Sequence, residues 1–77
     1  MKKISISLYA TLRKRRSDLA NLEPVTTKAT TIGELLDEIH ITKVEAAIVF
    51  VNEKRATLES KVQDGDKVSI FPILGGG

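Results

Sequence analysis

The sequence contains no cysteine and a single histidine, His40, among its 77 residues. A disulfide bond and a thiolate metal site are therefore excluded, and one imidazole cannot form a metal site unaided. The usual catalytic groupings are missing as well, because there is neither a cysteine and histidine pair nor a Gly-rich loop followed by Lys-Ser or Lys-Thr. We expect no catalytic activity from the chain alone, and no bound metal or other cofactor.

Excess charge of one sign and long apolar runs are also absent. Twelve Lys and Arg residues face ten Asp and Glu, and the net charge of +2 is too small to indicate a nucleic-acid-binding protein. The apolar runs are far shorter than a membrane span, and Met1-Lys2-Lys3 leads into an alternating pattern instead of the apolar block of a signal peptide. We therefore expect one cytoplasmic domain, residues 1–77, that binds neither nucleic acid nor a membrane.

The first part of the chain predicts two strands joined by a basic connection. Apolar residues alternate with serine or tyrosine between about Lys3 and Ala10, which is typical of a strand with one buried face. The four cations of Arg13–Arg16 indicate an exposed turn or a short helical connection, with a docking patch for an acidic partner or a phosphate as the functional alternative. Asn21–Thr27 is predicted to be a short edge strand that pairs with the first strand, since Pro24 excludes a central position.

A helix is predicted to follow, with Thr31 or alternatively Thr30 as its N-cap. The run Thr31-Ile32-Gly33-Glu34 has the spacing of a capping box, in which the Thr hydroxyl and the Glu carboxylate each bond a backbone N–H. Apolar residues recur at i, i+3, i+4 and i+7 and form one stripe: Ile32, Leu35, Leu36 and Ile39. His40 is predicted to close the helix as a structural cap, because a cation suits the negative end of the helix dipole.

An apolar run and a hairpin come next. Ala46–Val51 is almost unbroken in its β-prone apolar residues, which indicates a central strand that is covered on both faces and is the most buried part of the fold. Asn52-Glu53-Lys54 is predicted to turn the chain into a short return strand over Arg55–Thr57. In the loop after that strand, the side chains of Leu58 and Val62 are expected to pack inward.

The last strand is predicted over Lys67–Phe71, with Val68 and Ile70 on one face and Phe71 on the other. The preceding Asp64-Gly65-Asp66 is interpreted as a turn and not as a catalytic or calcium site. The resulting order of strand, strand, helix, strand, short strand and strand predicts an α+β fold in which a mixed sheet packs on one main helix. A crossover through that helix would make the neighbouring strands parallel.

The chain ends in Pro72-Ile73-Leu74-Gly75-Gly76-Gly77. Pro72 ends the strand ladder because it has no N–H to donate. The six residues Pro72–Gly77 can reach about 20 Å from the body when extended. Ordering each tail residue costs about 1–2 kcal/mol of backbone entropy, so we expect Phe71, Ile73 and Leu74 to compensate by burial in a partner protein.

The carboxylate of Gly77 is predicted to be the reactive group. A free carboxylate is a poor electrophile, but conversion to an acyl-adenylate supplies AMP as a leaving group, and the carbonyl carbon can then accept sulfur. Glycine leaves that carbon unshielded and allows a bare backbone to thread a narrow channel. The product would be a C-terminal thiocarboxylate.

The sequence resembles the MoaD/ThiS family of ubiquitin-like sulfur carriers. The family pattern comprises a Val-Asn-Gly-like turn, Asp-Gly-Asp before the final strand, Phe-Pro after it and Gly-Gly at the terminus. The corresponding segments here are Val51-Asn52-Glu53, Asp64-Gly65-Asp66, Phe71-Pro72 and Gly75-Gly76-Gly77. The first half matches in pattern only. The Phe-Pro junction and the long first connection, Thr11–Asn21, make the chain more similar to the MoaD branch than to the ThiS branch.

This resemblance implies a β-grasp fold and a sulfur carrier. Gly77 would be adenylated by an E1-like enzyme of the MoeB/ThiF type, which uses ATP, and then thiocarboxylated with sulfur from a persulfide donor. In the MoaD case, Gly75 and Gly76 would thread into a MoaE-like large subunit, where the thiocarboxylate donates sulfur in molybdopterin (molybdenum cofactor) biosynthesis. The residues implied at that interface are Phe71, Pro72, Ile73 and Leu74.

Several alternatives share the same tail. A ThiS-like carrier would serve thiamine thiazole synthesis with a thiazole synthase as its partner, and another carrier would serve tRNA thiolation. A ubiquitin-like modifier would use the activated carboxyl group to form an isopeptide bond with a lysine. In the simplest alternative, the domain is an interaction module whose tail has no chemical role.

Overall fold

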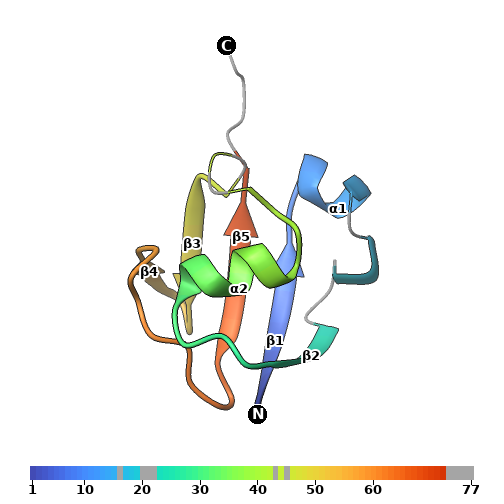
Figure 1. The fold of residues 1–77 in the computed structure, drawn as a ribbon. Coiled ribbons are helices and arrows are strands. Elements are labelled where there is room, and N and C mark those ends of the chain that lie inside the picture. The colour runs from blue at the N-terminus through green and yellow to red at the C-terminus, as the bar shows by residue number, and fades with distance from the viewer. Residues whose placement is uncertain (16, 20–22, 43, 45, 73–77) are drawn as a thin grey trace.

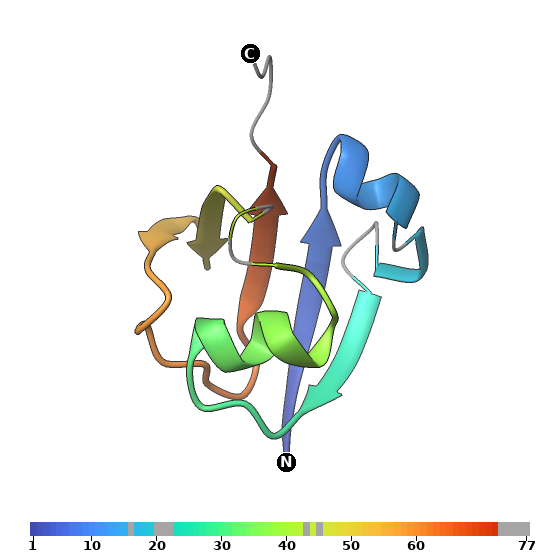
Figure 2. The same cartoon turned by 45° about the horizontal axis from the view of Figure 1, so that its top comes forward.

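The computed structural model describes residues 1–15, 17–19, 23–42, 44 and 46–72. The elements are β1 (Lys2–Leu8), α1 (Thr11–Arg15), the 3-10 turn η1 (Ser17–Leu19), β2 (Glu23–Thr27), α2 (Ile32–Glu38), β3 (Ile48–Val51), β4 (Lys54–Ala56) and β5 (Lys67–Phe71). The five strands form one sheet in the order β2-β1-β5-β3-β4. Helix α2 lies across one face of this sheet (Figures 1 and 2), as the sequence predicted.

The two strands at the centre of the sheet are the first and the last of the chain. β1 and β5 pair in parallel, with Ser5 opposite Lys67 and Leu8 opposite Ile70. The other neighbouring strands pair antiparallel. The strands that flank the helix, β2 and β3, run in the same direction as expected, and they are not adjacent because β1 and β5 lie between them. The parallel pair brings the C-terminal ends of β1 and β5 to the same edge of the sheet.

The hydrophobic core lies between the sheet and α2. The predicted alternation in the two central strands is confirmed, since Ile6, Leu8, Val68 and Ile70 are all fully buried. The predicted apolar stripe of the helix is buried against them: Ile32, Leu35, Leu36 and Ile39. Val62 also packs inward as expected.

The N-terminus of α2 differs from a capping box in one contact. Thr31 is the N-cap, and its hydroxyl accepts a hydrogen bond from the Glu34 N–H at 3.3 Å. The Glu34 carboxylate reaches back to Thr30 instead, where it accepts from the backbone N–H and from the hydroxyl, each at 2.9 Å. Because the Thr30 N–H bonds best to the ionised carboxylate, this contact lowers the pKa of Glu34 below its ordinary value of 4.5.

His40 closes α2 as predicted, and it does so through its backbone. The C-cap residue is Ile39, and its backbone N–H reaches the carbonyl groups of Leu35 and Asp37. His40 follows as an exposed residue with a φ of 62°, in the left-handed region. Its N–H donates to the Asp37 carbonyl at 3.3 Å, and the Ile41 N–H donates to the Leu36 carbonyl at 3.0 Å, so this turn caps the last carbonyl groups of the helix.

Strand β3 is shorter and less buried than predicted. It begins at Ile48, lies next to the edge strand β4, and of its residues only Val49 is buried. Because α2 covers a single face of the sheet, Ile48 and Phe50 on the other face stay half-buried. The prediction of a strand covered on both faces is therefore wrong, and the most buried strands are β1 and β5. The return strand β4 begins one residue earlier than predicted, at Lys54.

The basic connection adopts the helical alternative over the part that the structure describes. Thr11–Arg15 forms α1, in which Leu12 is buried while Arg13 and Lys14 are exposed. The helix therefore rests on the core through Leu12 and presents the side chains of Arg13 and Lys14 outward. The docking role of the run Arg13–Arg16 stays a prediction.

Candidate functional site

The predicted site begins where β5 ends. Phe71, the last residue of β5, is half-buried, and Pro72 beside it is buried. The remaining residues predicted for partner binding, tail threading and chemistry lie outside the described residues: Ile73, Leu74, Gly75, Gly76 and Gly77. The structure therefore defines the base of the tail and what surrounds it.

Three aromatic rings meet at this base. The ring of Tyr9 is stacked on the ring of Phe71, with centroids 4.2 Å apart and planes 9° apart. Phe50 of β3 meets Phe71 edge to face, with a centroid distance of 5.7 Å and an angle of 88°. The edge-to-face arrangement of Phe50 and Phe71 is one that aromatic pairs prefer. Phe71 is therefore held between two rings immediately before the chain leaves the sheet at Pro72.

The aromatic cluster of Tyr9, Phe50 and Phe71 lies on the face of the sheet opposite α2, called here the open face. Strand alternation places on this face the residues Lys3, Ser5, Ser7, Ile48, Phe50, Arg55, Lys67, Ser69 and Phe71. Arg55 pairs with Phe50 across β3 and β4, and it is exposed. The open face thus offers an apolar patch beside the end of β5, with cationic and hydroxyl side chains around it.

Two members of the aromatic cluster, Tyr9 and Phe50, were not predicted as site residues from the sequence. Tyr9 and Phe71 are far apart along the chain, and they meet because β1 and β5 pair in parallel, with the Tyr9 N–H donating to the Ile70 carbonyl at 3.2 Å. A signal for Tyr9 existed, because its alternation with Ser5 and Ser7 already placed it away from the core. Phe50 gave no such signal, since it lies inside a continuous apolar run.

The Asp-Gly-Asp turn at the opposite end of β5 is structural. Asp66 is buried, and its carboxylate accepts from Asn52 Nδ2 at 2.9 Å and from the Gln63 N–H at 2.8 Å. Asp64 accepts from the Lys3 N–H at 2.7 Å. Gly65 has a φ of 88°, which a glycine adopts without strain. These contacts tie the turn to β1 and to the β3–β4 hairpin, and so hold β5 in register.

No metal-binding group is formed by the described ranges, in which no three His, Cys, Asp or Glu side chains come together. Within the same ranges, no helix is long and apolar enough to cross a membrane.

The chain has a mixed five-stranded sheet, one covering helix and, after a central strand, a segment that ends in glycines. These features define a ubiquitin-like protein of the β-grasp class. The expected fold is confirmed. The sequence matches the model of the ThiS family over residues 6–77, and the chain therefore belongs to the ThiS family. No curated protein matches it.

Solved structures share this fold at low sequence identity. One is a Pyrococcus furiosus protein assigned as molybdopterin converting factor subunit 1, with a TM-score of 0.74, 17% identity, and coverage of 96% of this chain and 100% of that one. The small archaeal modifier protein 1 of Haloferax volcanii has a TM-score of 0.75, 18% identity, and coverage of 96% and 100%. The HVO 2177 protein of the same organism has a TM-score of 0.71, 22% identity, and coverage of 99% and 87%. At these identities the likeness shows the shared fold.

Proposed function

We propose that this chain is a sulfur carrier, which presents a C-terminal thiocarboxylate on Gly77 and donates its sulfur in molybdopterin biosynthesis. The observation that carries the proposal is that the ThiS-family match extends through residue 77 and so includes the three terminal glycines. The chain acts in this role as a cosubstrate, because the reacting atoms belong to its own terminus while the catalytic groups belong to its partners.

The chemistry starts from the Gly77 carboxylate. An E1-like enzyme of the MoeB/ThiF type transfers AMP from ATP to this carboxylate and releases pyrophosphate. The terminal sulfur of a persulfide donor then attacks the carbonyl carbon and displaces AMP. A thiol cleaves the S–S bond of the resulting acyl disulfide, which releases the thiocarboxylate and leaves a disulfide. Glycine at the last positions keeps this carbon accessible, and the absence of side chains suits passage through a narrow channel.

The open face supports the partner step. The aromatic cluster lies at the base of the tail, so a partner that holds the tail also meets Phe71 and Tyr9. Buried aromatic anchors contribute much of the binding energy in protein interfaces. Arg55 beside the cluster favours a partner whose rim is acidic. We propose this patch as the docking surface for the E1-like enzyme and for a MoaE-like large subunit.

Two features favour molybdopterin biosynthesis over thiazole synthesis. The Phe71-Pro72 junction and the long first connection are the features by which the sequence resembles the MoaD branch. That connection folds into α1 and η1 and so adds structure beside the edge from which the tail leaves (Figure 1). A thiazole synthase would be the sulfur acceptor in the alternative.

Protein modification is the second candidate. The fold is shared with a small archaeal modifier protein, and the same acyl-adenylate, attacked by a lysine amine, would give an isopeptide bond. The two candidates share activation and differ in the nucleophile.

One experiment tests activation and separates the candidates. The full chain is incubated with ATP, the E1-like enzyme of its own organism and a persulfide donor, and its intact mass is measured. Exchange of one oxygen for one sulfur supports the carrier, whereas adducts on target lysines support the modifier. The control is the same chain with Gly77 as a C-terminal amide, which keeps the tail length and removes the carboxylate. If the amide form shows the same mass change or the same lysine adducts as the free acid, the Gly77 carboxylate is not the reactive group and both candidates are wrong.

A further inference from the structure

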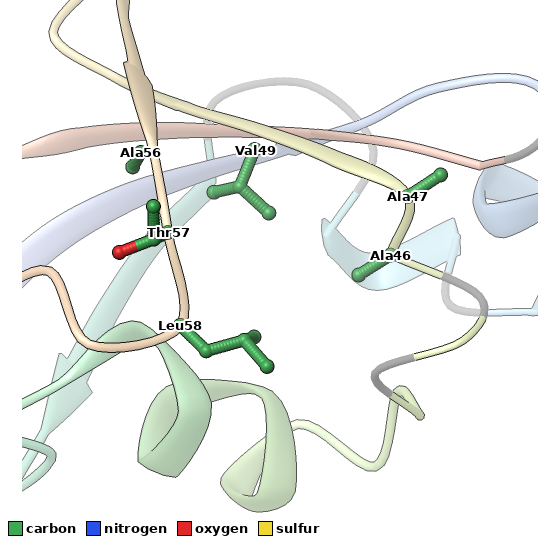
Figure 3. A pocket seen from close by; sticks show the side chains of 6 residues that line it. All are labelled: Ala46, Ala47, Val49, Ala56, Thr57 and Leu58. Atoms are coloured by element: carbon green, nitrogen blue, oxygen red, sulfur yellow. The ribbon is translucent and has the colours of Figure 1, made fainter.

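The two faces of the sheet differ in the contacts that they offer. On the α2 side, a groove of about 210 Å³ is lined only by uncharged residues (Figure 3): Ala46, Ala47, Val49, Ala56, Thr57 and Leu58. Leu58, which was predicted to pack inward, is 37% exposed at this groove. The groove therefore offers apolar contacts and no charge.

The open face, in contrast, is basic. Strand alternation places Lys3, Arg55 and Lys67 on it, and all three side chains are exposed. From β2 it receives only uncharged residues, since Pro24 is opposite Ser5 and Thr26 is opposite Lys3. Among the described strand residues on this face, none is acidic. Because the net charge of the whole chain is only +2, its excess of positive charge is concentrated here.

Two of these cations lie at the end of the open face that is farthest from the tail. Lys67 is opposite Ser5 on the neighbouring strand, and Lys3 is two residues before Ser5 on the same face. Lys67 is four residues before Phe71, which corresponds to about 13 Å along an extended strand. The lysine pair is therefore separate from the aromatic cluster, and one partner surface can contact both.

Two carboxylates adjoin the lysine pair, and both form hydrogen bonds within the turn before β5. Asp66 is buried and accepts from Asn52 Nδ2 and from the Gln63 N–H. Asp64 accepts from the Lys3 N–H at 2.7 Å. Both acids belong to the turn and not to the open face, so the exposed side chains of Lys3 and Lys67 stay accessible to a carboxylate of another protein.

We propose that Lys3 and Lys67 form an ionic anchor for an acidic patch on the E1-like enzyme. This inference rests on the proposed function, which names that enzyme as the partner. The acidic patch lies about 13 Å from the site at which the enzyme receives the aromatic cluster. Complementary charges raise the rate of association and fix the register of two proteins, while buried rings supply affinity. Three cations are fewer than the roughly 6–10 phosphate contacts of a strong nucleic-acid binder, so the face fits a protein better.

The test is surface plasmon resonance of the full chain with the E1-like enzyme of its own organism. Binding is measured at about 0.1 M and about 1 M salt, where the Debye length is roughly 10 Å and 3 Å. Lys3→Glu combined with Lys67→Glu should weaken binding by about tenfold at the lower salt concentration. At the higher concentration the difference should fall below about twofold, and the loss should appear mainly in the association rate.

The matched control is Lys28→Glu combined with Lys61→Glu, which changes the net charge equally. Both lysines are exposed near the start of α2, Lys28 in the loop before the helix and Lys61 in a bridge with Thr31. This control should weaken binding by less than about twofold at either salt concentration. Lys3→Gln combined with Lys67→Gln removes the two charges without placing new acids beside Asp64, and it should weaken binding by about threefold or more.

The outcomes separate this inference from the proposed function. If the native chain binds the enzyme and both open-face variants bind it as tightly as the control does, the ionic anchor is wrong and the proposed function stands. If the native chain does not bind the enzyme at either salt concentration, the proposed function fails and this inference fails with it. If the native chain binds a single-stranded oligonucleotide more tightly than the enzyme, and the open-face variants lose that binding, the cations serve a nucleic acid and the proposal is overturned.

Discussion

Replacing Phe71 with alanine separates a docking residue from a core residue. Phe71 is only partly exposed, so its truncation forfeits most of the roughly 1.5–3 kcal/mol that full burial of such a side chain contributes. It also removes two ring contacts, with Tyr9 and Phe50, each of which contributes about 0.5–1.5 kcal/mol. We therefore expect a loss of about 2–5 kcal/mol in the free energy of unfolding, measured by urea denaturation.

The same variant should weaken binding to the E1-like enzyme by about 30-fold or more, which corresponds to about 2 kcal/mol and to an interface hot spot. Isothermal titration calorimetry measures this constant on protein that remains folded. The matched control is Ile70→Val, the preceding residue of β5 on the buried face, which should cost about 0.5–1.5 kcal/mol of stability and leave the affinity unchanged. The affinity of Phe71→Ala could instead lie within about threefold of the native value, a difference of less than about 1 kcal/mol in binding free energy. That result would show that the aromatic cluster only stabilises the fold.

Three further predictions concern the scaffold. Glu53 has a φ of 71°, so Glu53→Gly should relieve about 1–2 kcal/mol of left-handed backbone strain. The conformational entropy that glycine loses on folding offsets about 0.5–1 kcal/mol of this gain. A lower urea midpoint for the variant would contradict the expected net gain in stability. The lowered pKa of Glu34 means that its stabilising contribution is present above 4.5 and is lost as the pH falls through the folded-state value. Glu34→Gln should therefore make the melting temperature less dependent on pH in acid, and an unchanged acid dependence would rule out this role. Asp66→Ala leaves the Asn52 amide and the Gln63 N–H without their acceptor, and should lower the free energy of unfolding by about 1–3 kcal/mol, measured by urea denaturation. A change below about 0.5 kcal/mol, which is typical of ordinary surface positions, would show that the turn does not need these hydrogen bonds.

Sequence periodicity predicted the elements well wherever one face of an element is buried. The alternation in β1 and β5 and the stripe of α2 each follow from the geometry of a single element against one core. The burial of Ala46–Val51 was predicted wrongly for a specific reason. An unbroken apolar run has the same composition whether helices cover both of its faces or aromatic rings occupy one face. Leu58 was misplaced for a similar reason, since its hydropathy does not say whether a groove or a packed core lies beneath it.

The prediction of Gly77 as the reactive group comes from the sequence by itself, because the chemistry of a terminal carboxylate depends on covalent structure and on the bare residues before it. It also determined the class of fold, through the order and periodicity of its elements. Only the tertiary structure decided which residues surround the base of the tail. The parallel pairing of the first and last strands is a long-range contact, and it brings Tyr9 onto Phe71 and places both rings on the open face.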